Sequence, residues 1–215
     1  METAHGVVLI GAQTFRRVNL LMRERVDSFT IVLQPGGLLS LFGVPGSALT
    51  DEHFEAESAL GRTVRALYER LGEVRSFPER AGVANEWLAG TLAPARSASV
   101  IRQAASHILA RRGCVRIAEI WEPTGLSLRQ FERRFRYEIG ITPKLYARIA
   151  RFEAALRRRS LRPGGRWTDI AHDLGYHDQM HMVHDFQALS GASPTGIERQ
   201  LDMFVKPEVT FGASR

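Results

Sequence analysis

Apolar residues recur at helical spacing through most of this chain. In the N-terminal part the spacing predicts one helix from about Thr50 to Gly72 and another from about Phe77 to Leu92. Before these helices, segments rich in Val, Ile, Leu and Phe predict three short strands, the first of them buried, at residues 6–11, 15–22 and 28–33. The N-terminal part is therefore predicted to be a small α+β domain.

From Val100 onward every predicted element is a helix. Glycine, proline and capping residues separate these elements, which we place at residues 100–112, 116–122, 128–139, 143–159, 169–174, 178–189 and from 194 onward. The fold class predicted is mainly α, with about seven helices in the C-terminal domain. A small, Pro- and Ser-rich linker at residues 92–99 separates the predicted domains, which are residues 1–95 and 97–203, followed by a tail at 204–215.

Two of the predicted C-terminal helices flank a glycine turn. The helix from Asp169 to Leu174 ends at Gly175, and Asp178 is a good N-cap for the next helix because its carboxylate can accept from free backbone N–H groups. Helix, glycine turn and helix is the outline of a helix-turn-helix. The second helix has a polar but nearly uncharged face, which suits the edges of DNA bases and is formed by Gln179, Met180, His181 and His184.

The same outline occurs once more upstream. The residues Gly125, Ser127, Phe135, Gly140, Thr142 and Pro143 parallel Gly175, Asp178, Phe186, Gly191, Ser193 and Pro194, with one residue of difference in the turn. An internal repeat of this kind indicates two copies of one supersecondary unit. The helix predicted at residues 143–159 joins the two copies.

The second copy resembles the second helix-turn-helix of the AraC/XylS family of bacterial transcription regulators. The matching residues are Asp169-Ile170-Ala171, Gly175-Tyr176, Asp178-Gln179, His181, Asp185-Phe186, Gly191 and Ser193-Pro194. This resemblance covers about residues 97–200 and implies a tandem helix-turn-helix domain. Residues 1–95 resemble, more loosely, part of the cupin-like effector domain of some members, although three strands are too few for a closed barrel, which needs about six or more.

The resemblance also implies which side chains face DNA bases. In the first motif these are Arg129, Glu132 and Arg133, and in the second they are Met180, His181 and His184. An arginine can donate two hydrogen bonds to guanine, and a glutamate can accept one from cytosine. The alternative for the first motif is an arginine face that contacts only phosphates. Four further arginines are either phosphate-binding candidates or solvated charge: Arg157, Arg158, Arg159 and Arg166.

Two residues of the first motif depart from the second. Trp121 occupies the place of Ala171, where two helices must approach closely, and Pro123 occupies the place of Asp173. Proline inside the end of a helix removes a hydrogen bond. We therefore expect the first motif to be shortened, with an early end to its first helix, or tilted.

Charge is distributed unevenly along the 215 residues, whose formal net charge is +6. Residues 1–98 contain 10 Lys/Arg and 11 Asp/Glu, a net charge of −1, whereas residues 99–215 contain 19 Lys/Arg and 12 Asp/Glu, a net charge of +7. An excess of positive charge on the half with the repeated motif is typical of a DNA-binding domain. A solvated basic surface without a partner is the alternative.

Composition argues against several other classes. The chain has no run of 18 apolar residues and no signal-peptide pattern at its start, so we expect no membrane span and a cytoplasmic, nucleoid-associated protein. The single cysteine, Cys114, leaves no internal disulfide and no Cys-rich zinc site. His177, His181 and His184 share one helix side, but no acid or cysteine completes a metal site. We expect no metal, no cofactor and no enzymatic activity.

The sequence thus predicts a sequence-specific transcription regulator that binds double-stranded promoter DNA and contacts or obstructs RNA polymerase. Residues 1–95 are expected to form a homodimer, and the sequence leaves open whether a small-molecule effector exists. One alternative is a ligand- or protein-sensing module with weakened DNA binding. Another is a DNA-repair methyltransferase with a related domain, which would need several cysteines where this chain has one.

Overall fold

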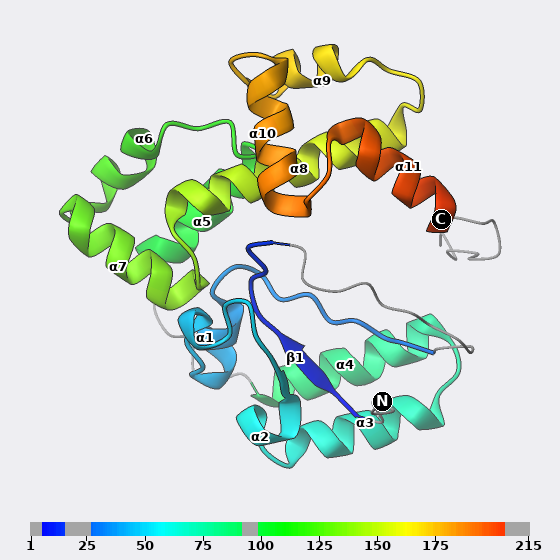
Figure 1. The fold of residues 1–215 in the computed structure, drawn as a ribbon. Helices are drawn as coiled ribbons and strands as arrows, with labels where there is room; N and C mark the ends of the chain where they lie inside the picture. The colour runs from blue at the N-terminus through cyan, green and yellow to red at the C-terminus, as the bar shows by residue number, and fades with distance from the viewer. Residues whose placement is uncertain (1–5, 16–26, 92–98, 205–215) are drawn as a thin grey trace. The chain divides into compact units, whose positions relative to one another are not determined.

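The computed structural model describes residues 6–15, 27–91 and 99–204, with side chains to residue 199. The described chain is mainly helical (Figure 1), as predicted. The elements of the N-terminal part are β1 (Val8–Ile10), α1 (Gly37–Phe42), η1 (Gly46–Ala48), β2 (His53–Glu55), α2 (Ala56–Leu60), α3 (Thr63–Glu73) and α4 (Phe77–Thr91). Those of the C-terminal part are α5 (Val100–Ala110), α6 (Ile117–Trp121), η2 (Glu122–Thr124), α7 (Leu128–Ile139), α8 (Pro143–Leu161), α9 (Trp167–Asp173), α10 (Gln179–Ser190) and α11 (Pro194–Phe204).

Contacts divide the chain into two compact units. The first contains the N-terminal elements together with α5, α6 and α7, and it extends to Ala147. The second contains Phe15 and the residues from Arg148 onward, with α9, α10 and α11, so the division of the C-terminal part falls inside α8. The linker predicted at residues 92–99 and the tail predicted at 204–215 fall almost entirely outside the described residues, and the predicted boundary at 95–97 stays a prediction.

The N-terminal sheet differs from the three predicted strands. β1 pairs with β2 in antiparallel register, with Val8 opposite Glu55 and Ile10 opposite His53. The strand predicted at 6–11 is confirmed, but its burial is wrong, because Val8 is 46% and Ile10 is 66% exposed. The strand predicted at 28–33 is wrong, because this segment is irregular, and residues 16–22 of the remaining one lie outside the described residues. The cupin-like resemblance is not shown by this two-stranded sheet.

The single helix predicted from about Thr50 to Gly72 is wrong: it is two helices, α2 and α3, separated at Gly61, and α2 begins only at Ala56, because the backbone turns before it. Asp51 has a left-handed φ of 59°, and its carboxylate accepts hydrogen bonds from the amide and the hydroxyl of Thr14, at 2.7 Å each. These bonds hold the segment that follows β1 beside the segment that precedes β2. The chain therefore enters β2 extended and starts α2 after it.

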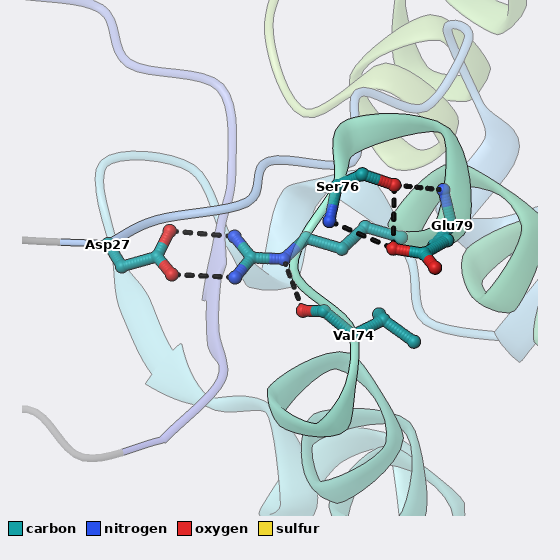
Figure 2. A network of polar contacts seen from close by, with 5 residues as sticks. Asp27, Val74, Ser76 and Glu79 are labelled. Carbon is teal, nitrogen blue, oxygen red and sulfur yellow. Dashed lines mark hydrogen bonds and ion pairs between the residues drawn. The ribbon is translucent and has the colours of Figure 1, made fainter.

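A small core and one arginine clamp hold the helices of the N-terminal part. The buried apolar residues there are Leu49, Ala56, Val64, Leu67 and Ala84. The Arg80 guanidinium donates to both carboxylate oxygens of Asp27 at 2.6 Å and to the carbonyl oxygen of Val74 at 3.3 Å (Figure 2). The bond from Arg80 is the main cause that lowers the pKa of Asp27. The clamp fixes the segment after residue 26 to the turn between α3 and α4.

The first unit also joins its N-terminal elements to α5 and α7. The hydroxyl of Thr50 donates to the carbonyl oxygen of Gly140 at 2.6 Å, and Arg102 of α5 donates to the hydroxyl of Ser40 at 2.8 Å. Gly46 packs so closely on the end of α7 that a Cβ atom there would lie 2.6 Å from the carbonyl carbon of Ile139. The N-terminal elements thus contact α7 directly.

Aromatic residues form the core of each helix-turn-helix region. In the first unit, Phe135 contacts the rings of Phe131 and Tyr146. In the second, Phe186 contacts the rings of Phe152 and Trp167 at centroid distances of 4.7 and 5.5 Å. Seven α-helices occupy the described residues from 99 to 204, which confirms the predicted number. No helix in the described part of the chain is long and apolar enough to cross a membrane.

Candidate DNA-binding surface

The first motif consists of α6, the 3-10 turn η2, Gly125 and α7. Gly125 has a φ of 69°, a conformation that glycine adopts without strain. Ser127 then caps α7: its hydroxyl accepts from the amide of Gln130, and the Gln130 side chain accepts from the amide of Ser127. This reciprocal capping box fixes the start of α7 and therefore the direction of the side chains that follow.

α7 buries one face and exposes a charged one. Phe131, Phe135 and Ile139 are buried, whereas the three predicted base-facing residues, Arg129, Glu132 and Arg133, are exposed. None of these three side chains forms a hydrogen bond or an ion pair with another described residue. Their donors and acceptors remain available, as a base-contacting or phosphate-contacting face requires.

The expected early end of the first helix of this motif, caused by Pro123, is confirmed. α6 ends at Trp121, and the 3-10 turn η2 follows with Pro123 in its first turn. The indole N–H of Trp121 donates to the carbonyl oxygen of Leu126 at 2.7 Å, so this side chain lies along the turn. The expected tilt of the motif stays a prediction.

The second motif consists of α9, Gly175 and α10. Gly175 has a φ of 64°, and the Asp178 carboxylate accepts from the amide of His181 at 2.7 Å, as an N-cap does. This backbone hydrogen bond, together with His177, lowers the pKa of Asp178. α9 starts at Trp167, two residues before the predicted start, because the buried Trp167 indole packs on Phe186.

α10 exposes the residues that were predicted to face bases. Met180 is 59% exposed, and His181 and His184 are also exposed, while Met182 and Phe186 on the opposite face are fully buried. The His181 ring packs edge-on against the ring of Tyr176, with centroids 5.5 Å apart. The start of this exposed face is therefore fixed by both a backbone cap and a ring contact.

Two arginine side chains of α8 contact residues of the second motif. The Nε of Arg148 donates to Oδ1 of Asp185 at 2.8 Å, and Asp185 is the one buried charged residue among those described. One turn later, the guanidinium of Arg151 lies 5.2 Å from the centroid of the Tyr176 ring. Sequence analysis did not single out Arg148 or Asp185 as a pair. The available signal was the Asp185 carboxylate beside the apolar positions of α10, because a buried carboxylate must find a partner.

Three of the four arginines proposed as phosphate candidates are used within the protein. Arg158 pairs with Asp173, and Arg166 pairs with Asp169 at 3.1 Å. The Nε of Arg159 donates to Glu198 at 2.8 Å, and its guanidinium lies 5.4 Å from the Trp167 ring. Arg157 is exposed and forms no ion pair with another described residue. The Arg158 pair connects α8 to α9 and the Arg159 pair connects α8 to α11, whereas the Arg166 pair lies within the start of α9.

The arrangement defines a helix-turn-helix, in which a capped helix with an exposed polar face follows a glycine turn. Residues 122–200 match the family model described as a helix-turn-helix domain, of the AraC type. This match supports an AraC/XylS-type, DNA-binding transcription regulator, and the matched domain is a regulatory domain that is not typically catalytic. Neither the curated proteins nor the solved structures gave a match to this chain.

Proposed function

We propose that this protein is a sequence-specific transcription regulator that binds promoter DNA through two recognition helices, α7 and α10. The observation that supports this best is the repeat of one local design: each helix has a side-chain N-cap, a buried aromatic face and an exposed polar face. The match to an AraC-type helix-turn-helix covers both helices. The net charge of +7 on residues 99–215 adds the long-range attraction that a DNA-binding domain needs.

The length of α8 suits insertion into successive major grooves. α8 has 19 residues, which correspond to about 28 Å at a rise of 1.5 Å per residue. Successive major-groove faces on one side of B-DNA lie about 34 Å apart. In the proposed complex, α8 spans the step between the grooves that receive α7 and α10.

The exposed faces of the two helices suggest different base contacts. Arg129 and Arg133 offer the bidentate fork that recognises guanine, and Glu132 offers an acceptor for cytosine. On α10, the imidazoles of His181 and His184 can each donate to or accept from a base edge, and the Met180 side chain offers an apolar contact for a thymine methyl group. Specificity would then come from the sum of both faces.

The proposal extends to protein partners. DNA-bound α7 and α10 would place the protein where it contacts or obstructs RNA polymerase. The N-terminal part would form a homodimer, because its two-stranded sheet exposes the apolar side chains of Val8 and Ile10 on one face. We assign no effector to the N-terminal part.

Selection from a pool of random-sequence duplexes tests the proposed function directly. The full-length chain is expected to enrich a motif whose two conserved blocks lie about one helical turn apart. The His184→Ala variant should lose base preference within one block, whereas Arg133→Ala should weaken binding more evenly across sequences. The control is heparin-blocked beads without the protein. If the full-length protein enriches no motif and binds random duplexes no better than these beads do, the proposed function is wrong.

A further inference from the structure

The ion pair between Arg148 and Asp185 occurs at one helix-turn-helix motif and has no equivalent at the other. Asp185 lies seven residues after the N-cap Asp178, and the residue seven positions after the N-cap Ser127 is Arg134, which is exposed. The Asp185 side chain is 5% exposed and that of Arg148 is 35% exposed. A buried ion pair of this kind is weak support for stability, since desolvation offsets the attraction. Another role for the pair therefore has to be considered.

The hydrogen bonds of the pair leave the guanidinium available to a ligand. Nε of Arg148 donates to Oδ1 of Asp185, and both Nη groups keep their N–H donors free of other described residues. Oδ2 of Asp185 is buried and has no hydrogen-bond partner among the described residues. The carboxylate thus holds the guanidinium in one orientation through a single bond, and the outer edge of the guanidinium stays partly exposed.

The position of Asp185 on α10 decides where that edge lies. With 3.6 residues per turn, Asp185 falls between the buried Met182 and Phe186 on one side and the exposed His181 and Ala188 on the other. Arg148 therefore lies at a flank of α10, beside the face with His181 and His184. A major groove about 12 Å wide holds a helix about 10–12 Å across, so the flanks of an inserted helix lie against the phosphate backbones.

We propose that Arg148 of α8 binds a DNA phosphate beside the second recognition helix, and that the buried Asp185 is the positioning residue that orients it. This inference rests on the proposed insertion of α10 into a major groove. An arginine anchored through Nε presents Nη donors in a fixed fork that matches phosphate oxygens. Phosphate contacts of this type set the register of a recognition helix without selecting a base.

The double variant R148Q/D185N tests this proposal in the full-length protein. It has the same net charge as the wild type, and glutamine and asparagine can hydrogen-bond in place of the ion pair. The probes are a duplex enriched in the selection and, separately, a random-sequence duplex, each titrated over a range of salt concentrations. The variant should weaken binding to both probes and lower the slope of log affinity against log salt by about 1, with unchanged base preference. R62Q, at the N-cap of α3, is the charge control and should leave the slope nearly unchanged.

Each outcome bears on one proposal. If the folded double variant has the wild-type slope, Arg148 has only a structural role and the inference is overturned. A change in preference at particular base pairs would also overturn it, because Arg148 would then act through the bases. If R148Q/D185N fails to fold, R148M/D185L replaces it, since well-packed apolar residues commonly substitute for buried ion pairs. Wild-type protein that binds neither probe contradicts the proposed function itself.

Discussion

The hydroxyl of Thr50 donates a 2.6 Å hydrogen bond to the carbonyl oxygen of Gly140, a residue 90 positions away that caps the C-terminal end of α7. Gly140 has a φ of 104°, and its amide closes the last turn of α7 on the carbonyl oxygen of Arg136. The N-terminal part of the chain thus contacts the far end of a proposed recognition helix. We therefore expect a movement of the segment around Thr50 to shift the C-terminal end of α7.

Gly46→Ala should disrupt this contact and destabilise the first unit. The added Cβ would lie 2.6 Å from the carbonyl carbon of Ile139 and 2.7 Å from the carbonyl oxygen of Glu138, so the backbone has to shift. Overpacking of this kind costs about 1–3 kcal/mol, which urea unfolding monitored by circular dichroism would measure. Gly82→Ala in α4 is the matched control: its Cβ meets nothing within 4 Å, so it should leave stability unchanged or raise it. Equal unfolding midpoints for Gly46→Ala and the wild type would show that η1 does not pack on α7 in solution.

His184→Ala and Arg133→Ala should affect DNA recognition differently. Loss of a base contact by His184 should relax specificity at particular base pairs by about 1–3 kcal/mol. Arg133 lies on α7 in the first motif, whose first helix ends at Trp121, and its removal should weaken binding more evenly across sequences. Affinities for all single-base variants of the selected duplex distinguish the two patterns. A sharp change of base preference in Arg133→Ala would mean that the first motif docks as the second does.

The N-cap of α10 should make the stability of the second motif depend on pH. The hydrogen bond from the His181 amide lowers the pKa of Asp178 from its ordinary value of 3.8. A lowered folded-state pKa means that the stabilisation is complete above the unfolded value and is lost as the pH falls through the folded value. Asp178→Ala should therefore lower the melting temperature at neutral pH and have little effect in strong acid.

Asp178→Asn provides the control for that measurement. Asparagine also caps helices but does not titrate, so its difference from the wild type should change with pH while its helix stays capped. Thermal melts of the three proteins over the acid range give the comparison. A melting-temperature difference between Asp178→Ala and the wild type that is the same at all pH values would show that the carboxylate charge is not involved.

Ile10→Arg should weaken the proposed homodimer. Ile10 is 66% exposed on β1, and a charge there would be costly to bury against a second copy. Sedimentation of the full-length protein at micromolar concentration should show a shift from dimer to monomer. Val32→Arg is the control, because Val32 is 86% exposed and lies outside both strands. A wild-type protein that sediments as a monomer would end the proposal of a dimer.

The C-terminal half could be predicted from the sequence because its signals are local. Ser127, Gly140 and Asp178 specify helix ends within a few residues of themselves, and the bounds of α7 were predicted as found. The N-terminal half could not, because its structure depends on distant partners. β2 forms only where β1 pairs with it, and the left-handed backbone of Asp51 is stabilised by bonds to Thr14.

The exposed faces of α7 and α10 were predictable for the same reason, since the buried aromatic residues fix which side of each helix is exposed. The contact between Arg148 of α8 and Asp185 of α10 was not predictable. Arg148 and Asp185 are 37 residues apart, and nothing in the local pattern pairs them. Several arginines of α8 could have served as well, and the structure shows that Arg158 and Arg159 pair with acids of other helices.

The close fit of Gly46 against α7 limits where this chain can be divided or recombined. A chimera joined within residues 92–98 would retain both helix-turn-helix motifs, yet it would replace the backbone that packs on Ile139 and Gly140 with an unrelated surface. A junction in α8 near Ala147 would instead transfer the first motif together with its N-terminal support. The N-terminal elements and the first motif therefore form one exchangeable part, which is larger than a helix-turn-helix motif, and the second motif can be exchanged without disturbing the contact of Gly46 with α7.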